Sequence, residues 1–583
     1  MGDLTQSNRA AALTSPSVGE AGSGDSNQSA AGDTTRWPIS LLWPEGKRAH
    51  TARPLADSAA TDLSLDVIIH ALDLDHRHGR AIRAILYDLC TDPATICYRQ
   101  DILADLRALP ALTAALEEIL PYLADLGSAS AANWPGDSPL GPVVARLREL
   151  ERYVWCVDRL QAILQAEEGL HSDGLRRLRD GVNALAADSE VAALRSQLPA
   201  LQSLIGQASS VTIGLNLGQD LLPESATIVE LNRAPFKGPR SLLGRLLPRS
   251  GDQVGLTPLH LAGPPPLRRD SQLFKDLQRL LEAVTAPLGR ALVRYKEINV
   301  APLAALEAEL AFFLGAAALA HRLETAGIAL CRPSMSPTSE QTCVVAGAAN
   351  MALALQMLDL RKDTPLDGQL VASDVSFAAG TQILVVTGPN RGGKTTFCRA
   401  VGQAQVLFQS GLYVLGTSAS MRPVHGIWTH FPLPETDRPG AGRLDEEVRR
   451  LRQIFDEAGP ESLILLNEPL TSTSERDALM IARDVVRALQ ALGARAVLIT
   501  HLHDLALAIP QLNAGAPENR TIASLVAEAV VAGGGTRGTF RIVPGVPTGR
   551  SYAAAIAEQH GLTFHQLQQL LAERGFGADR PAP

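Results

Sequence analysis

The chain has 583 residues, of which 46% are hydrophobic, with a formal net charge of -8 and an isoelectric point near 5.9. This length and apolar content are enough for several buried cores. The acidic balance excludes a protein coated with basic residues, although it leaves room for a local basic patch.

Two classes of protein are not supported by the sequence. Six cysteines are scattered without a C-x-x-C spacing or a neighbouring set of histidines, so neither a zinc motif nor a disulfide framework is indicated. The start of the chain lacks the basic and apolar regions of a signal peptide, and no apolar run approaches the roughly 18 residues of a membrane span. We therefore expect a cytoplasmic protein with no membrane partner.

The first part of the chain changes from polar to helical. Residues 1–60 are expected to form a disordered tail and a lead-in, because their first half is rich in Ser, Gly, Ala, Asp and Thr. Residues 61–355 are expected to form a mostly helical region, in which Pro93 suits the first turn of a helix. Apolar residues recur every three or four positions within 143–164 and 273–323, which is typical of long amphipathic helices.

A different pattern separates these two helical stretches. Residues 211–216 and 227–231 alternate and carry β-branched side chains, so we expect a small β-containing tip at about 205–270. Seven basic residues then fall within 233–269, against a single acid, Asp252. Two interpretations stay open, a solvated loop or a contact with a phosphate backbone. The candidate contacts are Lys237, Arg240, Arg245 and Arg249.

Residues 356–583 are expected to form an α/β domain followed by a C-terminal helical segment. Residues 462–466 and 496–499 are nearly continuous apolar runs, as expected for parallel strands covered on both faces. The first run ends in Asn467 and Glu468, and the second in Thr500 and His501. Ligands of open α/β sheets bind at the carboxyl ends of strands, so we expect these pairs to converge on one site.

The most informative stretch follows a third apolar run, residues 383–386. It fits G-x-x-x-x-G-K-[ST] and leads into a helix-forming segment, which predicts a phosphate loop that binds ATP with Mg2+. Its glycines let backbone N–H groups face phosphate oxygens, while Lys394 reaches the β and γ phosphates and Thr395 offers a hydroxyl to Mg2+. The alternative is a glycine-rich turn before a helix. The candidate nucleotide-binding residues are Gly388, Pro389, Asn390, Arg391, Gly392, Gly393, Lys394, Thr395 and Thr396.

The strand-end residues suggest the chemistry. Glu468 is the candidate that orients and deprotonates the attacking water, and His501 the candidate that senses the γ-phosphate; the alternative is that both are ordinary polar residues after strands. Asn467 stands where Asp normally precedes a catalytic Glu. With Thr395 it is the candidate Mg2+ ligand, but its amide oxygen lacks a negative charge, so slow hydrolysis is expected.

These residues carry a family resemblance. Residues 388–396, GPNRGGKTT, resemble the phosphate loop of the MutS-type mismatch-repair ATPases, whose Pro-Asn pair and double glycine separate them from most other ABC-superfamily ATPases. The resemblance covers about residues 65–575 and is strongest over 365–555. The other similar segments are 91–93 with 98–100, 373–375, 411–414, 471–473, 500–501, 543–546 and 550–553.

The resemblance implies a P-loop ATPase head of ABC/MutS type, joined to a mostly helical core and lever region. It also implies a head-to-head homodimer in which a segment of the partner subunit closes each nucleotide site. The residues placed where that segment should lie are Gly440, Gly442 and Arg443. The mismatch-reading domain and the nuclease-like extension of the second bacterial MutS subfamily are not evident, so we expect no mismatch recognition.

Three functions follow from these expectations. The first is an ATP-dependent, DNA-binding dimeric clamp that senses branches or junctions rather than mismatches, together with a repair or recombination partner protein. The second is a nucleotide-gated scaffold that docks a protein, hydrolyses ATP slowly or not at all, and makes no direct DNA contact. A general ABC-type ATPase is the third, although the sequence of the loop disfavours it.

Overall fold

A computed structural model describes most of the chain, namely residues 39–44, 53–128, 140–206, 210–217, 219, 223–234, 272–336, 342–366, 368–378, 380–432, 442–532, 535–547 and 560–574. The chain divides into two units, Met1–Pro38 and Ile39–Pro583, and only the second contains described residues. Most of the expected tail, the four candidate DNA contacts and Gly440 therefore lie outside the description.

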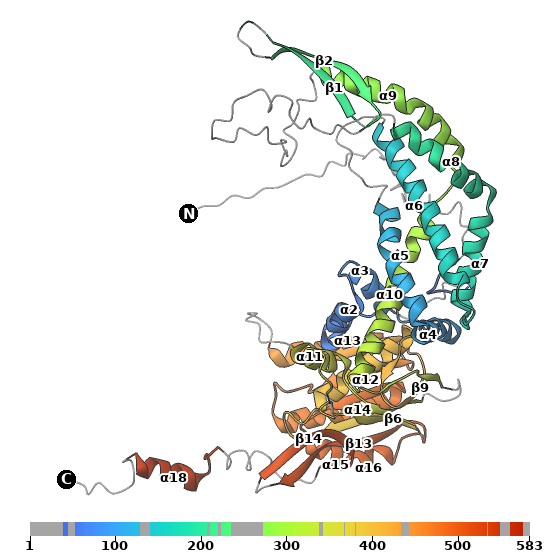
Figure 1. Ribbon diagram of the computed structural model, residues 1–583. Coiled ribbons are helices and arrows are strands. Elements are labelled where there is room, and N and C mark those ends of the chain that lie inside the picture. Colours follow the sequence, from blue (N-terminus) through green and yellow to red (C-terminus); the bar gives the residue numbers. More distant parts are fainter. Residues whose placement is uncertain are drawn as a thin grey trace, which may run out of the picture. The chain divides into compact units, whose positions relative to one another are not determined.

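The first part of the described chain is helical, as expected (Figure 1). Pro93 starts its helix, and Asp92 caps it by accepting a hydrogen bond from the Thr95 amide at 3.1 Å, which confirms the predicted helix start. The elements are α1 (Asp57–Asp62), α2 (Leu65–Leu72), α3 (Gly79–Tyr87), α4 (Pro93–Ala108), α5 (Pro110–Ser128), α6 (Leu140–Gln165), α7 (Asp173–Ala187), α8 (Ser189–Gly206), α9 (Gln272–Leu292), the 3-10 turn η3 (Val293–Tyr295) and α10 (Ala301–Thr325).

The second predicted helical stretch is two helices rather than one. The 3-10 turn and a short irregular segment separate α9 from α10, where Pro302 lies in the first turn of the new helix. Helix α10 is long and apolar enough to cross a membrane by length and composition, although the sequence was expected to hold no apolar run of that length. About two thirds of its apolar window is buried inside the protein, where it packs against α2, α4 and α5. That packing accounts for its apolar sequence.

The predicted β tip is an antiparallel pair, β1 (Ser210–Leu217) and β2 (Pro223–Asn232). Helix α9 follows the tip in the chain, packs against β2 and returns alongside α8 and α6 (Figure 1). Residues far apart in the sequence thus form one helical layer next to the strand pair.

The C-terminal region is built on a six-stranded sheet in the order β10-β11-β12-β7-β13-β14. Five strands are parallel, and β14 pairs antiparallel with β13 at one edge. The sheet strands are β7 (Thr381–Thr387), β10 (Gly426–His430), β11 (Ser462–Asn467), β12 (Arg495–Ile499), β13 (Thr521–Ala532) and β14 (Gly535–Pro544). The helices of this region are α11 (Met351–Arg361), α12 (Lys394–Gln409), α13 (Arg443–Glu457), α14 (Glu475–Leu492), α15 (His503–Leu507) and α16 (Ile509–Asn513), followed by α18 (Phe564–Glu573), which has no buried residues.

Smaller sheets move the predicted domain boundary. The strands β3 (Leu330–Cys331), β4 (Ser334–Met335), β5 (Cys343–Ala348), β6 (Ser373–Phe377), β8 (Val414–Leu415) and β9 (Ser418–Met421) form a two-stranded and a four-stranded sheet. Strand β5 pairs with both β6 and β9, so strands before residue 355 belong with strands after it. The predicted division between 355 and 356 falls inside α11 and is wrong for this reason. The α/β region begins near Leu330.

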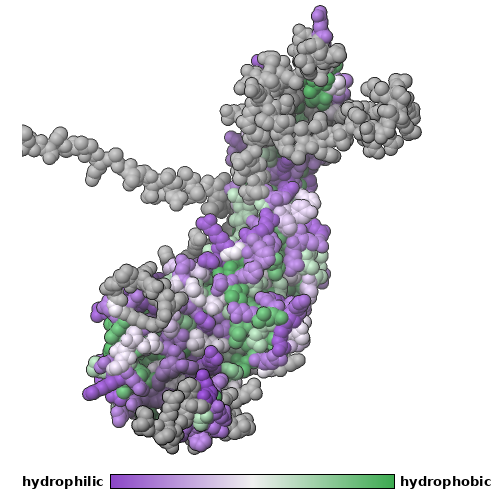
Figure 2. Space-filling model, turned by 90° about the vertical axis from the view of Figure 1, so that its left-hand side faces the viewer, coloured by the Kyte–Doolittle hydropathy of each residue, from purple (hydrophilic) through white to green (hydrophobic). Residues whose placement is uncertain are grey.

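On the face drawn in Figure 2, hydrophilic residues predominate, and hydrophobic residues form smaller patches between them.

A short lead-in segment packs onto the helices. Leu41 is fully buried, and its amide donates a 2.6 Å hydrogen bond to Glu309 of α10. The predicted lead-in thus includes an anchored segment at 39–44.

Candidate functional site

The phosphate loop joins the buried strand β7 to α12 through a backbone that only glycine tolerates at two points. Gly388 and Gly393 have φ values of 132° and 89°. A Cβ on Gly393 would lie 2.7 Å from the Phe540 carbonyl oxygen, and one on Gly388 would lie 2.7 Å from the Ala527 Cβ. The loop therefore packs closely on the β13–β14 hairpin, which holds it around the start of α12.

Lys394 is the first residue of α12 and is only 4% exposed. Its Nζ donates hydrogen bonds to the carbonyl oxygens of Gly388 and Pro389, both at 2.9 Å, and lies 3.7 Å from Glu468 Oε1. Burial lowers the pKa of Lys394, while Glu468 opposes that shift. A buried cation facing carbonyl dipoles at a helix N-terminus forms an anion-binding environment.

Strand register brings the other predicted residues to the same edge. Ile499 of β12 lies opposite both Val386 of β7 and Asn467 of β11, so the three strands end side by side. Residues 388, 468 and 501 follow closely after these ends. The structure thus brings together the strand-end pairs, as the sequence predicted.

Glu468 lies between two basic groups. His501 Nε2 is 2.9 Å from Glu468 Oε1, the oxygen that also faces Lys394. The hydrogen bond from His501 is the main reason that the pKa of Glu468 is held below its usual range, and Lys394 contributes to the same shift. Glu468 also has a positive φ of 51°, which is uncommon for a residue other than glycine. Its carboxylate is therefore ionised and firmly oriented.

Asn467 and Thr395 form the predicted pair at the start of α12. Asn467 is 5% exposed, and its Oδ1 accepts a 3.2 Å hydrogen bond from the Thr395 hydroxyl. The two side-chain oxygens therefore lie together beside Lys394 and Glu468. Both are oxygen donors of the kind that a hard divalent cation prefers, but neither carries a charge.

A cavity of about 260 Å³ adjoins the loop, and sequence reasoning missed most of the residues around it. Asn350, Leu353 and Phe540 line it together with Thr396 and Phe397 of α12. Asn350 also caps α11 and donates a 3.3 Å hydrogen bond to the Thr396 carbonyl oxygen. The lining residues come from segments nearly two hundred residues apart, so no local sequence motif predicts this cavity. Phe540 also has a positive φ of 64°, a backbone conformation that its sequence does not indicate.

The loop helix is tied directly to the helical region. Gln403, 1% exposed, donates a 2.8 Å hydrogen bond to the Leu63 carbonyl oxygen between α1 and α2, and its Oε1 accepts one from the Met351 amide at 2.8 Å. One turn earlier, Arg399 Nε donates to the Asp62 carbonyl oxygen at 2.8 Å. A displacement of α12 would therefore strain or break these hydrogen bonds to the backbone at α1, α2 and α11.

A second link joins α13 to the loop after Glu468. The Glu447 carboxylate accepts hydrogen bonds from the hydroxyls of Ser472 at 2.8 Å and Thr471 at 3.3 Å. Gly442 is exposed at the N-cap of α13, and among the described residues no neighbouring atom lies within 4 Å of a Cβ built on it. The predicted closing segment therefore begins a helix whose first turns contact the Glu468 loop of the same chain.

Comparison with known proteins agrees with this arrangement. Residues 91–326 match the MutS2 N-terminal domain family, and residues 384–562 match MutS domain V. The first range starts at the Thr91-Asp92-Pro93 segment, and the second contains the phosphate loop, Glu468 and His501. The two matches divide at the junction of the helical and α/β regions.

Curated relatives match parts of the chain. Endonuclease MutS2 of Streptococcus equi subsp. equi is 30% identical over 222 residues, 38% of this chain and 27% of that protein. Endonuclease MutS2 of Thermomicrobium roseum is 28% identical over 309 residues, 52% of this chain and 36% of that protein. DNA mismatch repair protein MutS of Thermosynechococcus vestitus is 31% identical over 176 residues, which are 30% of this chain and 19% of that protein. The matched segments thus span well under half of these relatives. Together with the two domain matches, they show that the chain belongs to the MutS family.

Proposed function

We propose that this protein is an ATP-dependent, DNA-binding ATPase that acts as a dimeric clamp. The observation that carries the proposal is the arrangement of Lys394, Glu468 and His501 at the ends of three adjacent strands. The match to MutS domain V, which is a P-loop ATPase domain, supports it.

The residues fit ATP with Mg2+. The glycine cradle leaves no room for a Cβ at 388 or 393, and the first N–H groups of α12 have no acceptor within the helix. Lys394 would exchange its carbonyl partners for phosphate oxygens, and Thr395 with Asn467 would hold Mg2+. The adjoining cavity at Asn350 and Phe540 would take the nucleoside. When bound, Mg2+ supplies positive charge that screens the phosphates.

The chain's own residues would then act as follows. Glu468 accepts a hydrogen bond from the attacking water and takes its proton, because its carboxylate is ionised and oriented. His501 holds that carboxylate through Nε2 and monitors the phosphate end of the site. The lowered pKa of Glu468 weakens it as a proton acceptor, so we expect slow turnover.

We infer that nucleotide state is passed to the helical region through α12. Gln403 and Arg399 connect this helix to the backbone at Asp62 and Leu63. In the dimer, Gly440, Gly442 and Arg443 of one copy close the nucleotide site of the other. Glu447 then couples that closing segment to the loop after Glu468.

For the DNA ligand we propose a branch or junction rather than a mismatch. A clamp holds DNA of unusual shape by backbone contacts, without base readout. The relatives' names, Endonuclease MutS2 and DNA mismatch repair protein MutS, support a role on DNA, and a repair or recombination protein is the expected partner. Lys237, Arg240, Arg245 and Arg249 are the proposed phosphate contacts.

The test is binding to homoduplex, mismatched and four-way-junction DNA at two salt concentrations, with and without ATP. We expect salt-sensitive binding with a preference for the junction, and a shallower salt dependence when Lys237, Arg240 and Arg245 are replaced by alanine. Replacing exposed Arg53, Arg159 and Arg452 is the matched control for lost charge. Absence of binding to all three DNAs would reject the clamp.

Asn467 favours a second function, a nucleotide-gated scaffold that docks a protein and makes no direct DNA contact. Without a charged Mg2+ ligand, the bound nucleotide would persist and act as a switch. This alternative predicts tight ATP binding, turnover near background and no affinity for DNA. The DNA experiment combined with an ATPase assay separates the two functions.

A further inference from the structure

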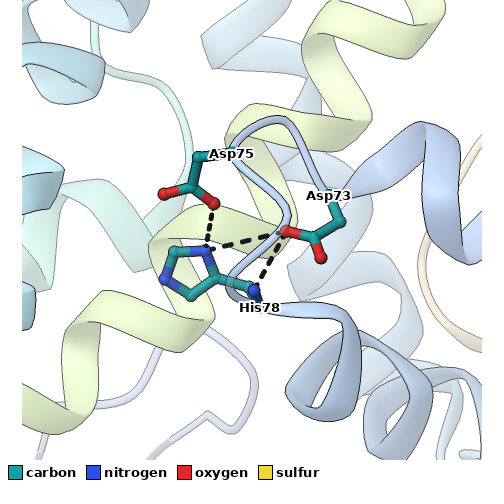
Figure 3. Close-up of side chains that lie close together, drawn as sticks. All are labelled: Asp73, Asp75 and His78. Carbon is teal, nitrogen blue, oxygen red and sulfur yellow. Dashed lines mark hydrogen bonds and ion pairs between the residues drawn. The ribbon is translucent and has the colours of Figure 1, made fainter.

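A buried histidine in the helical region, His78, lies beside the carboxylates of Asp73 and Asp75 (Figure 3). His78 is 7% exposed and precedes α3, while Asp73 and Asp75 come from the loop between α2 and α3. His78 Nδ1 lies 2.9 Å from Asp75 Oδ1 and 3.9 Å from Asp73 Oδ1. The three potential ligand atoms all lie within 4.8 Å of one another.

The loop backbone fixes this arrangement. Asp73 Oδ1 accepts hydrogen bonds from the amides of Arg77 and His78 at 3.1 and 3.0 Å. Asp73 is itself buried, whereas the Asp75 side chain is 38% exposed. One carboxylate is thus held rigidly by the chain, and the other faces an opening to solvent.

A third carboxylate contacts the far side of the ring. Glu307 of α10, more than two hundred residues away in the sequence, places Oε1 2.7 Å from His78 Nε2. A histidine that ligates a metal through one nitrogen typically donates its other N–H to a carboxylate, which fixes the tautomer and the ring orientation. Glu307 stands in that position, on a different element from the loop.

The local charge is not balanced. Among the described residues, the ion pairs of Asp73, Asp75 and Glu307 are all made to His78, and none involves a lysine or arginine. Even as an imidazolium, His78 leaves an excess of two negative charges on three carboxylates. Asp73 is buried and Glu307 mostly so, and a charge held out of water is costly when uncompensated, so a cation would relieve this excess.

We propose that Asp73, Asp75 and His78 form a binding site for a divalent transition-metal ion of the zinc class. The metal takes the place of the proton on His78 Nδ1, with one oxygen each from Asp73 and Asp75, and Glu307 accepts the hydrogen bond from Nε2. Ligand atoms about 2 Å from zinc at tetrahedral angles lie roughly 3.3 Å apart, and the two observed separations from Nδ1, 2.9 and 3.9 Å, bracket that spacing. The mixed imidazole and carboxylate set favours zinc over Mg2+.

The location gives the site a structural consequence. The loop joins α2 to α3, Glu307 belongs to α10, and α10 packs against both α2 and α3. Helix α3 also contacts α12, which carries the phosphate loop. A bound ion would clip these helices together, so zinc should stabilise the fold whether or not nucleotide is present.

The experiment uses the full chain, stripped with a chelator, then incubated with zinc and freed of loose metal by gel filtration. Elemental analysis should find about one zinc per chain in the wild type, and zinc should raise the melting temperature. Asp75→Asn and His78→Gln should lose the bound zinc. Glu307→Gln should retain the ligands but weaken affinity about 10- to 100-fold. Because zinc displaces a proton, affinity should rise with pH.

Two controls keep the result specific. Asp66→Asn removes an exposed carboxylate of α2 and should bind zinc like the wild type. His501→Ala removes the histidine of the nucleotide site and should leave the stoichiometry unchanged, which excludes that site as the source. Equal zinc content in the wild type and Asp75→Asn, or equal thermal shifts in both, would overturn the proposal. His78 would then be an imidazolium clamp, and His78→Gln would lower the melting temperature equally with and without zinc.

Discussion

Buried polar residues occur in both the helical region and the α/β region, but their partners differ. In the helical region, Arg99 donates to the Leu42 carbonyl oxygen and Gln100 to the Pro333 carbonyl oxygen. Asp105 accepts from the amides of His171 and Ser172. Each of these side chains bonds to the backbone of a remote segment and so fixes the position of that segment.

At the carboxyl edge of the sheet, the polar side chains contact one another, and Lys394 also donates to the Gly388 and Pro389 carbonyl oxygens of its own loop. Lys394 faces Glu468, Glu468 is bound by His501, and Thr395 donates to Asn467. Such contacts can be exchanged for those of a ligand without unfolding a segment. Polar side chains that bond to the backbone of a remote segment hold the fold, whereas those that contact one another at the sheet edge serve the site. Substitutions can test this distinction.

The largest expected effect is at Lys394. Lys394→Ala removes a buried cation whose partners are carbonyl oxygens, so the fold should persist while nucleotide binding is abolished, by about 100-fold or more. Binding of a fluorescent ATP analogue measures the loss, and circular dichroism checks the fold. Lys296→Ala removes an exposed lysine as the control. Wild-type affinity in Lys394→Ala would contradict the nucleotide site.

Glu468→Gln should separate binding from hydrolysis. The amide keeps the shape of the side chain but cannot take a proton, so turnover should fall about 100-fold or more while bound ATP is trapped. Single-turnover assays with labelled ATP measure both quantities. Glu461→Gln, near the other end of β11, is the control and should hydrolyse normally. Continued turnover in Glu468→Gln would reject Glu468 as the base.

Gln403 lies where the two regions meet, so its replacement should affect stability more than nucleotide affinity. Gln403→Leu leaves the Leu63 carbonyl and the Met351 amide without their buried partner, at a cost of about 2 kcal/mol in the free energy of unfolding. ATP should still bind, but its effect on DNA binding should weaken. Urea denaturation measures the first effect, with Gln453→Leu on the exposed face of α13 as control. If ATP changed DNA binding by Gln403→Leu as strongly as in the wild type, α12 would have to act on the helical region by another route.

The same distinction explains what the sequence was able to predict. Loop residues 388–396 and the strand ends at 467 and 500 are local patterns whose register follows from parallel pairing. Asn350, Gln403 and Phe540 gain their roles only from segments distant in the chain, so no spacing reveals them. The boundary near 355 was wrong because two-residue strands such as β3 carry too few residues for an alternating pattern. The roles of the individual site residues stay predictions.

Asn467→Asp tests whether a missing charge limits hydrolysis. Aspartate can still accept the hydrogen bond from Thr395, so the change adds charge without breaking that contact. Turnover should rise up to about tenfold, and less Mg2+ should be needed for half-maximal rate. Asn519→Asp, at an exposed position before β13, controls for added charge elsewhere. Unchanged turnover and Mg2+ dependence would remove charge as the cause of slow hydrolysis.

The smallest effect is expected from His501→Ala and concerns pH. His501 is the main cause of the lowered pKa of Glu468, so its removal should raise that pKa and move the acid limb of kcat/KM to higher pH. A carboxyl group with a lowered folded-state pKa stabilises the protein above its unfolded pKa, and this stabilisation is lost as pH falls through the folded pKa. The stability difference between wild type and His501→Ala should therefore shrink on acidification. His503→Gln, two residues along the chain, should leave both profiles unchanged. An unmoved acid limb in His501→Ala would mean that the limb reports a group other than Glu468.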